Sequence, residues 1–158
     1  MRWLTIASLT LIAAGGANSP TMTAGSVTAE IRSEGSRPVV RRLWDTGEFD
    51  RVLDAIAAGE GEWIAISPDL AAGADAAAAE GLGIALARAL PKNAAAVLSV
   101  LDPGQPSIST AHVCGLPFVE GTISDIKGYR DQAEAALGQV HSAALADRKA
   151  ACLADLQR

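Results

Sequence analysis

The chain has 158 residues, of which 49% are hydrophobic, 20% charged and 4% aromatic, and its formal net charge is −5. An acidic chain without a Lys/Arg cluster lacks the electrostatic pattern of proteins that bind nucleic acids or anionic membranes. The length fits one domain with a single hydrophobic core, so we expect no nucleic-acid partner and no second domain.

The N-terminal segment MRWLTIASLTLIAAGGA places Arg2 before an apolar run, which small residues follow. This order is typical of a secretory signal peptide, which we assign to residues 1–17. The apolar run is shorter than the roughly 20 residues of a spanning helix, so an uncleaved membrane anchor is the weaker alternative. The leader has no cysteine for lipid attachment. We therefore predict an exported, soluble protein, periplasmic or secreted, with no stable membrane anchor after cleavage.

The next segment, residues 18–35, is rich in Ser, Thr and Gly and poor in large apolar side chains. Such a composition predicts a flexible N-terminal tail, with a local helix around residues 27–32 as the alternative. The single helical domain then covers residues 36–158.

The domain begins with two amphipathic stretches. Apolar residues at four-residue spacing, including Val40 and Trp44, predict a helix over residues 37–46. A second helix is expected from Phe49 to Gly59, again with apolar residues three and four positions apart. The short connection between the two stretches predicts an antiparallel hairpin.

Helix breakers and caps divide the middle of the chain. Pro68 predicts a short helix interrupted near Ser67, with a buried strand over residues 62–67 as the alternative. Asp75 is expected to cap a longer helix that stops at Pro91, and Asn93 to cap the next one. The glycines of GLGIAL fall inside the longer helix, where we expect close packing rather than nucleotide binding.

The C-terminal third contains an irregular stretch. Residues 105–121, QPSISTAHVCGLPFVEG, show no sustained helical period and predict a partly buried loop. A helix with an apolar stripe from Ile126 to Val140 is expected next, and a break near His141 precedes a terminal helix. The predicted fold class is all-α, an irregular array of about six short helices with one disulfide-tethered loop.

Cys114 and Cys152 are the two cysteines of the chain. In an exported protein such a pair forms a persistent disulfide, so we predict a bond that fastens the loop to the last helix. The alternative is a reactive thiol with His112 as its base, which requires a partly exposed site that lowers the thiol pKa. The spacing alone indicates no such site, and the disulfide is favoured.

Three runs of the sequence carry a family resemblance. They are GEWIAISPDLAAGADAAAAEGLGIALARALPKNAAAVLSVL, HVCGLPF and RKAACLADL. Together they resemble small uncharacterised exported helical proteins of bacteria, over roughly residues 43–157 and including both cysteines. The resemblance implies an exported helical fold and brings no catalytic or binding role.

Candidate recognition residues lie in the disulfide-tethered loop: His112, Leu116, Phe118 and Glu120. A metal site that adds Cys114 or Asp125 is an alternative, but a His-x-Cys pair is only a fragment of a zinc site, and we expect no cofactor. Carboxylates can also supply an acid/base pair, although helix caps and solvated faces explain most of them; they are Asp69, Asp75, Glu80 and Glu120. Four aromatic residues are expected in the core rather than at a binding surface; they are Trp44, Trp63, Phe118 and Tyr129.

The function predicted from these patterns is a non-enzymatic protein-interaction module of the bacterial envelope, with an unknown protein partner. One alternative is an enzyme or small-ligand carrier with a site around His112 and Glu120. The other is a structural envelope protein that needs no specific ligand.

Overall fold

The computed structural model describes residues 22–118 and 123–158, and every regular element within these ranges is helical. The elements are α1 (Ala24–Glu34), α2 (Ser36–Asp45), α3 (Glu48–Ala57), α4 (Gly61–Ala65), α5 (Ser67–Gly73), α6 (Ala76–Ala89), α7 (Ala94–Val100), η1 (Pro106–Ile108), α8 (Thr110–Cys114), α9 (Ile126–Gly138), η2 (Ala143–Leu145) and α10 (Ala146–Leu156). The all-α class is confirmed. The expected number of about six helices is too low, because isolated short helices are unstable and only packing reveals them. The signal peptide assigned to residues 1–17 lies outside the described residues.

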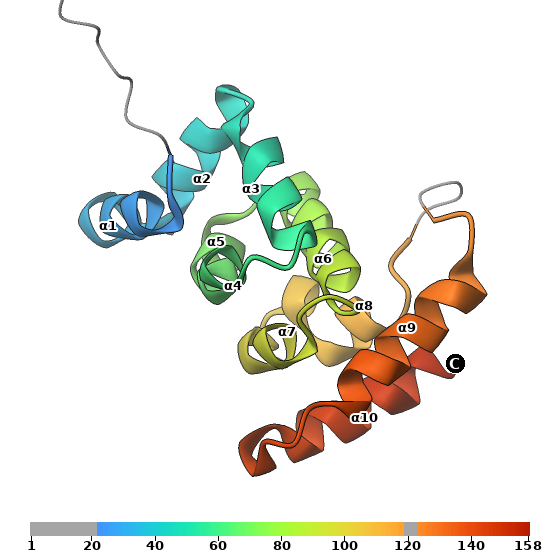
Figure 1. The fold of residues 1–158 in the computed structure, drawn as a ribbon. Coiled ribbons are helices and arrows are strands. Elements are labelled where there is room, and N and C mark those ends of the chain that lie inside the picture. The colour runs from blue at the N-terminus through green and yellow to red at the C-terminus, as the bar shows by residue number, and fades with distance from the viewer. Residues whose placement is uncertain (1–21, 119–122) are drawn as a thin grey trace, which may run out of the picture.

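The helices follow one another across the molecule, from α1 and α2 at one end to α9 and α10 at the other (Figure 1). The predicted α2–α3 pair touches through Trp44 and Phe49, whose ring centroids are 5.9 Å apart. The main partner of α2 is α5, however, and that of α3 is α6. The two helices therefore belong to a wider helical layer rather than to a separate hairpin.

The expected tail contains a helix. Thr23 caps α1 by accepting a hydrogen bond from the Ser26 N–H at 3.1 Å, and the Ser26 hydroxyl oxygen accepts one from the Thr23 N–H. One face of α1 is buried against the core by Ala24, Val27 and Ile31. The flexible-tail prediction is therefore wrong for residues 24–34, because a few small apolar residues suffice when other helices cover them.

The predicted caps and breaks are present in the middle of the chain. Ile66 separates α4 from α5, with Pro68 in the first turn of α5, so the strand alternative is wrong. Asp75 accepts a hydrogen bond from the Ala78 N–H at 3.1 Å, and Asn93 accepts one from the Ala96 N–H at 3.3 Å. Each side chain satisfies an N–H group that has no partner within its own helix.

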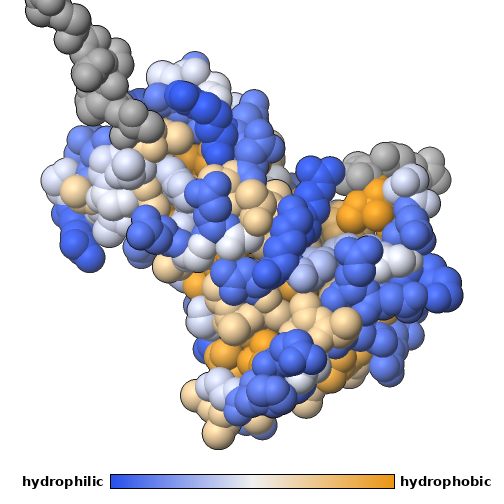
Figure 2. Space-filling model, in the orientation of Figure 1, coloured by the Kyte–Doolittle hydropathy of each residue, from blue (hydrophilic) through white to orange (hydrophobic). Residues whose placement is uncertain are grey.

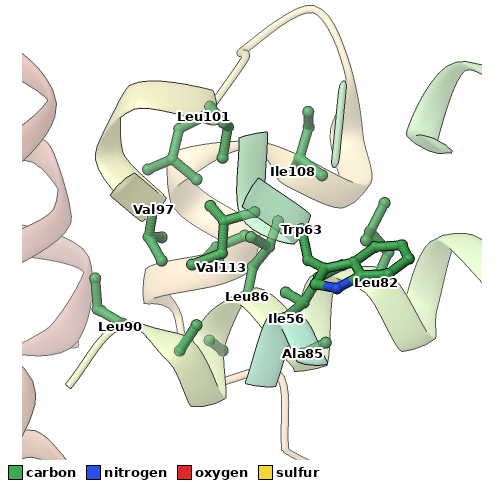
Figure 3. Packing of buried hydrophobic residues seen from close by; sticks show 14 of the residues in the cluster. Ile56, Trp63, Leu82, Ala85, Leu86, Leu90, Val97, Leu101, Ile108 and Val113 are labelled. Atoms are coloured by element: carbon green, nitrogen blue, oxygen red, sulfur yellow. The ribbon is translucent and has the colours of Figure 1, made fainter. Parts of the chain in front are cut away.

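The core is centred on α6, where Leu82, Leu86 and the C-cap residue Leu90 are fully buried (Figure 3). The glycines of this helix allow close packing, as predicted: a Cβ at Gly83 would lie 2.5 Å from the His112 ring. On the face shown in Figure 2, apolar surface gathers over α7.

The segment expected to be an irregular loop is partly helical, with η1 and α8 in residues 105–118. Ser109 caps α8 by accepting a hydrogen bond from the His112 N–H at 3.2 Å. The predicted disulfide is confirmed: Cys114 at the end of α8 bonds to Cys152 of α10, and both are fully buried. The stretch is thus tethered to the last helix, as expected.

The apolar stripe of α9 differs from the predicted one. Tyr129, Ala133 and Leu137 are buried, whereas Ile126 at the start of the helix is 36% exposed. Asp125 caps this end, accepting a hydrogen bond from the Gly128 N–H at 2.7 Å. The cap sets the first turn in solvent, so the buried stripe begins at Tyr129.

Tyr129 makes a buried hydrogen bond to the last turn of α6. The Ala87 carbonyl accepts from the Leu90 N–H at 3.2 Å, and because Pro91 has no N–H, its second partner is the Tyr129 hydroxyl, which donates at 2.8 Å. Tyr129→Phe is expected to lower the free energy of unfolding by about 1 kcal/mol, since it removes this buried hydrogen bond. Urea denaturation followed by circular dichroism measures the change.

The same variant tests a pH dependence. Burial raises the pKa of Tyr129 above its ordinary value of 10.0. The contribution of the buried, protonated phenol to the free energy of unfolding is complete below about pH 10. It is lost as the pH rises further, because the phenol of the unfolded chain releases its proton first. Tyr129→Phe should therefore lose less stability than the wild type in alkaline solution. Equal losses in the two proteins would show that the phenol is not buried.

Candidate functional site

The residues expected to form a recognition loop mainly serve packing. Leu116 and Phe118 are partly buried against the core, and Phe118 meets Tyr129 edge to face with centroids 4.9 Å apart. His112 is partly buried on α8, and Glu120 lies outside the described residues. The three described residues, His112, Leu116 and Phe118, therefore do not form an exposed surface.

A hollow of about 460 Å³ does lie beside His112. It is lined by Ala76, Glu80, Pro106, Ser107, Ala111, His112, Gly115 and Pro117. The Nε2 atom of His112 is buried without a hydrogen-bond partner, and its edge of the ring lies against Gly83 of α6. That nitrogen is in contact with the core.

The predicted metal alternative finds no support in the described part of the chain. Within it, no group of three or more His, Cys, Asp or Glu side chains is arranged to hold an ion. Cys114 is in the disulfide and the Asp125 carboxylate caps α9. These two candidate ligands have structural roles.

A groove of about 450 Å³ lies where α2 passes the junction of α5 and α6. Its lining residues are Arg37, Val40, Arg41, Trp44, Asp45, Gly73, Ala74, Asp75 and Ala78. Val40, Gly73 and Ala78 are buried, while the arginine, aspartate and tryptophan side chains are exposed. The groove thus joins a small apolar floor to a charged rim.

Trp44 is the main departure from the sequence prediction. Its side chain is 45% exposed, whereas Trp63 and Tyr129 are buried as expected. The core-facing side of α2 is occupied by Val39, Val40 and Leu43, which leaves the indole at the edge of that face. Contact with the Phe49 ring on one side supports the indole while its remaining surface faces solvent.

Comparisons with known proteins identify no relative. No protein-family model, curated protein or solved structure matches this chain. None of the helices in residues 22–118 and 123–158 is long and apolar enough to cross a membrane.

The sequence analysis did not identify the groove residues, because the net negative charge of the whole chain gave no indication of a local group of cations. Arg37, Arg41 and Trp44 stand at positions i, i+4 and i+7, which places them on one face of α2. That spacing was available in the sequence as a stripe of cations ending at an aromatic residue. The sequence does not show which side of α2 the other helices leave uncovered.

Proposed function

We propose that this chain is an exported, non-enzymatic interaction module of the bacterial envelope, and that it binds a protein partner through the groove beside α2. The observation that carries the proposal is the exposed Trp44 at the rim of a groove with a buried apolar floor. Tryptophan and arginine are enriched among the residues that contribute most to protein–protein affinity. The groove supplies both.

The support of Trp44 by Phe49 favours this use. An aromatic ring already held against a neighbour loses little conformational entropy when a partner covers it. Its exposed surface costs solvation free energy in the free protein, and a partner that covers it recovers that cost. Packing of α2 against α5, and of α5 against α6, holds these helices in place, so the groove exists before binding.

Trp44→Ala is expected to weaken partner binding about 30-fold, the effect of losing a central hot-spot residue. The measurement is quantitative pulldown from an envelope fraction with the wild-type chain and the variant, followed by affinity measurement with each purified partner. The matched control is Ile126→Ala, because Ile126 is the other exposed large hydrophobic residue in the described ranges.

The control should recover the same partner as the wild type, and Trp44→Ala should not. Circular dichroism and urea denaturation check that both variants are folded. If all three proteins recover the same partner with equal affinity, the groove is not the recognition surface and the proposal is wrong.

A further inference from the structure

We infer that the groove beside α2 receives an acidic segment of the partner that carries one apolar anchor residue; this inference rests on the proposed function. Its first support is a pair of arginines without carboxylate partners. Neither Arg37 nor Arg41 forms a salt bridge within the described ranges. Arg42, the next residue of α2, is by contrast bonded to Glu30 and Glu48. Arg42 therefore links α2 to α1 and α3, whereas Arg37 and Arg41 line the groove.

The rim also holds two carboxylates, Asp45 and Asp75, and neither forms a salt bridge with this pair. One oxygen of Asp75 accepts the Ala78 N–H, so this side chain caps α6. Asp45 lies eight positions after Arg37, about 12 Å further along the helix axis. It also forms no salt bridge with Arg41 one turn away. Within the described ranges, the guanidinium groups of Arg37 and Arg41 therefore have no carboxylate partner.

A guanidinium group recognises a carboxylate through two parallel hydrogen bonds, which gives direction as well as attraction. The chain carries a net charge of −5, but that field is screened beyond about 8 Å at physiological salt. Local contacts with the arginines then decide the sign of the charge on the partner segment that binds. The rise from Arg37 to Trp44 is about 10 Å, or roughly three residues of extended peptide. In a segment with a carboxylate and an apolar side chain at that separation, the carboxylate can contact Arg37 while the apolar side chain contacts Trp44.

The test uses fluorescence anisotropy with the full chain and a labelled probe peptide, Glu-Glu-Ser-Leu-Ser. Two matched peptides replace both glutamates by lysine or the leucine by serine. We expect the glutamate–leucine peptide to bind and both matched peptides to bind at least about fivefold more weakly. Raising the salt concentration should weaken the first complex, since the ion pairs are exposed.

Charge reversal on the protein completes the test. Arg41→Glu should weaken binding of the glutamate peptide about fivefold. Arg32→Glu is the matched control, because Arg32 is exposed on α1 and does not line the groove; it should leave the affinity unchanged. The double variant Arg37→Glu/Arg41→Glu should prefer the lysine peptide, and this gain of binding also shows that the variant is folded.

Four results would overturn the inference. The first is binding of the glutamate peptide that is indifferent to both arginine reversals, and the second is preference of the wild type for the lysine peptide. The third is binding to phosphatidylglycerol vesicles, lost in the double variant, without peptide binding, which would assign the arginines to a lipid surface. The fourth is no binding of any peptide. If Trp44-dependent partner capture persists in that case, the proposed function stands and only the acidic segment is wrong.

Discussion

Loss of the disulfide is expected to lower the free energy of unfolding by about 4 kcal/mol, the chain entropy released when a loop of this length opens. Cys114 and Cys152 are 38 positions apart, and their Cα atoms lie 5.2 Å from each other. A domain of this size has only about 5–15 kcal/mol of net stability, so the loss is a large share. The variant of choice is Cys114→Ala/Cys152→Ala, which leaves no hydroxyl group in a buried position.

Urea denaturation of the wild type, the double alanine variant and the reduced, alkylated protein measures the effect. The variant and the reduced protein should both unfold at lower urea concentration than the oxidised wild type. Part of α10 should remain attached, because the Arg148 side chain donates to the Leu98 and Ser99 carbonyls of α7, each at 3.1 Å. Equal midpoints for oxidised and reduced protein would contradict the entropic role of the bond.

Gly73→Ala is expected to destabilise the fold by about 3 kcal/mol, at the upper end of the cost of overpacking a core. A Cβ at this position would lie 2.4 Å from the Ser36 carbonyl carbon and 2.7 Å from the Arg37 nitrogen. Both are main-chain atoms, which cannot rotate aside as a side chain can. Helices α2 and α5 would have to separate, and the floor of the groove beside α2 would widen.

The matched control is Gly138→Ala, because a Cβ there would meet no atom within 4 Å. Alanine is the better helix former, so this variant should be stabilised by up to about 1 kcal/mol. Thermal unfolding of the two variants and the wild type measures both effects: Gly73→Ala should lower the unfolding temperature and Gly138→Ala should raise it. A neutral or stabilising Gly73→Ala would show that α2 and α5 do not approach as closely as described.

Local chemistry explains what could be predicted of this fold. Asp75 and Asn93 cap helices because their side chains reach N–H groups three residues away, an interaction that needs no distant partner. Pro68 interrupts the helical pattern for an equally local reason. The disulfide follows from there being a single possible pair of cysteines once export is expected.

The faces of the helices required the tertiary structure. α1 is a packed helix because other elements cover Val27 and Ile31, and the composition of residues 18–35 contains no sign of that cover. Likewise, Trp44 shares the spacing of Val40 and was expected beside it in the core. Its exposure depends on where α5 and α6 pass α2, which is a property of the whole arrangement.

The sequence by itself therefore determined the all-α class, the main caps and breaks, and the covalent tie between α8 and α10. Only the tertiary structure decided that the recognition surface we propose is the groove at Trp44 rather than the tethered stretch containing Leu116 and Phe118. The physical reason is that caps and breaks act over three or four residues. Burial of a helix face, by contrast, is set by elements distant in the chain, such as Gly73 against Ser36.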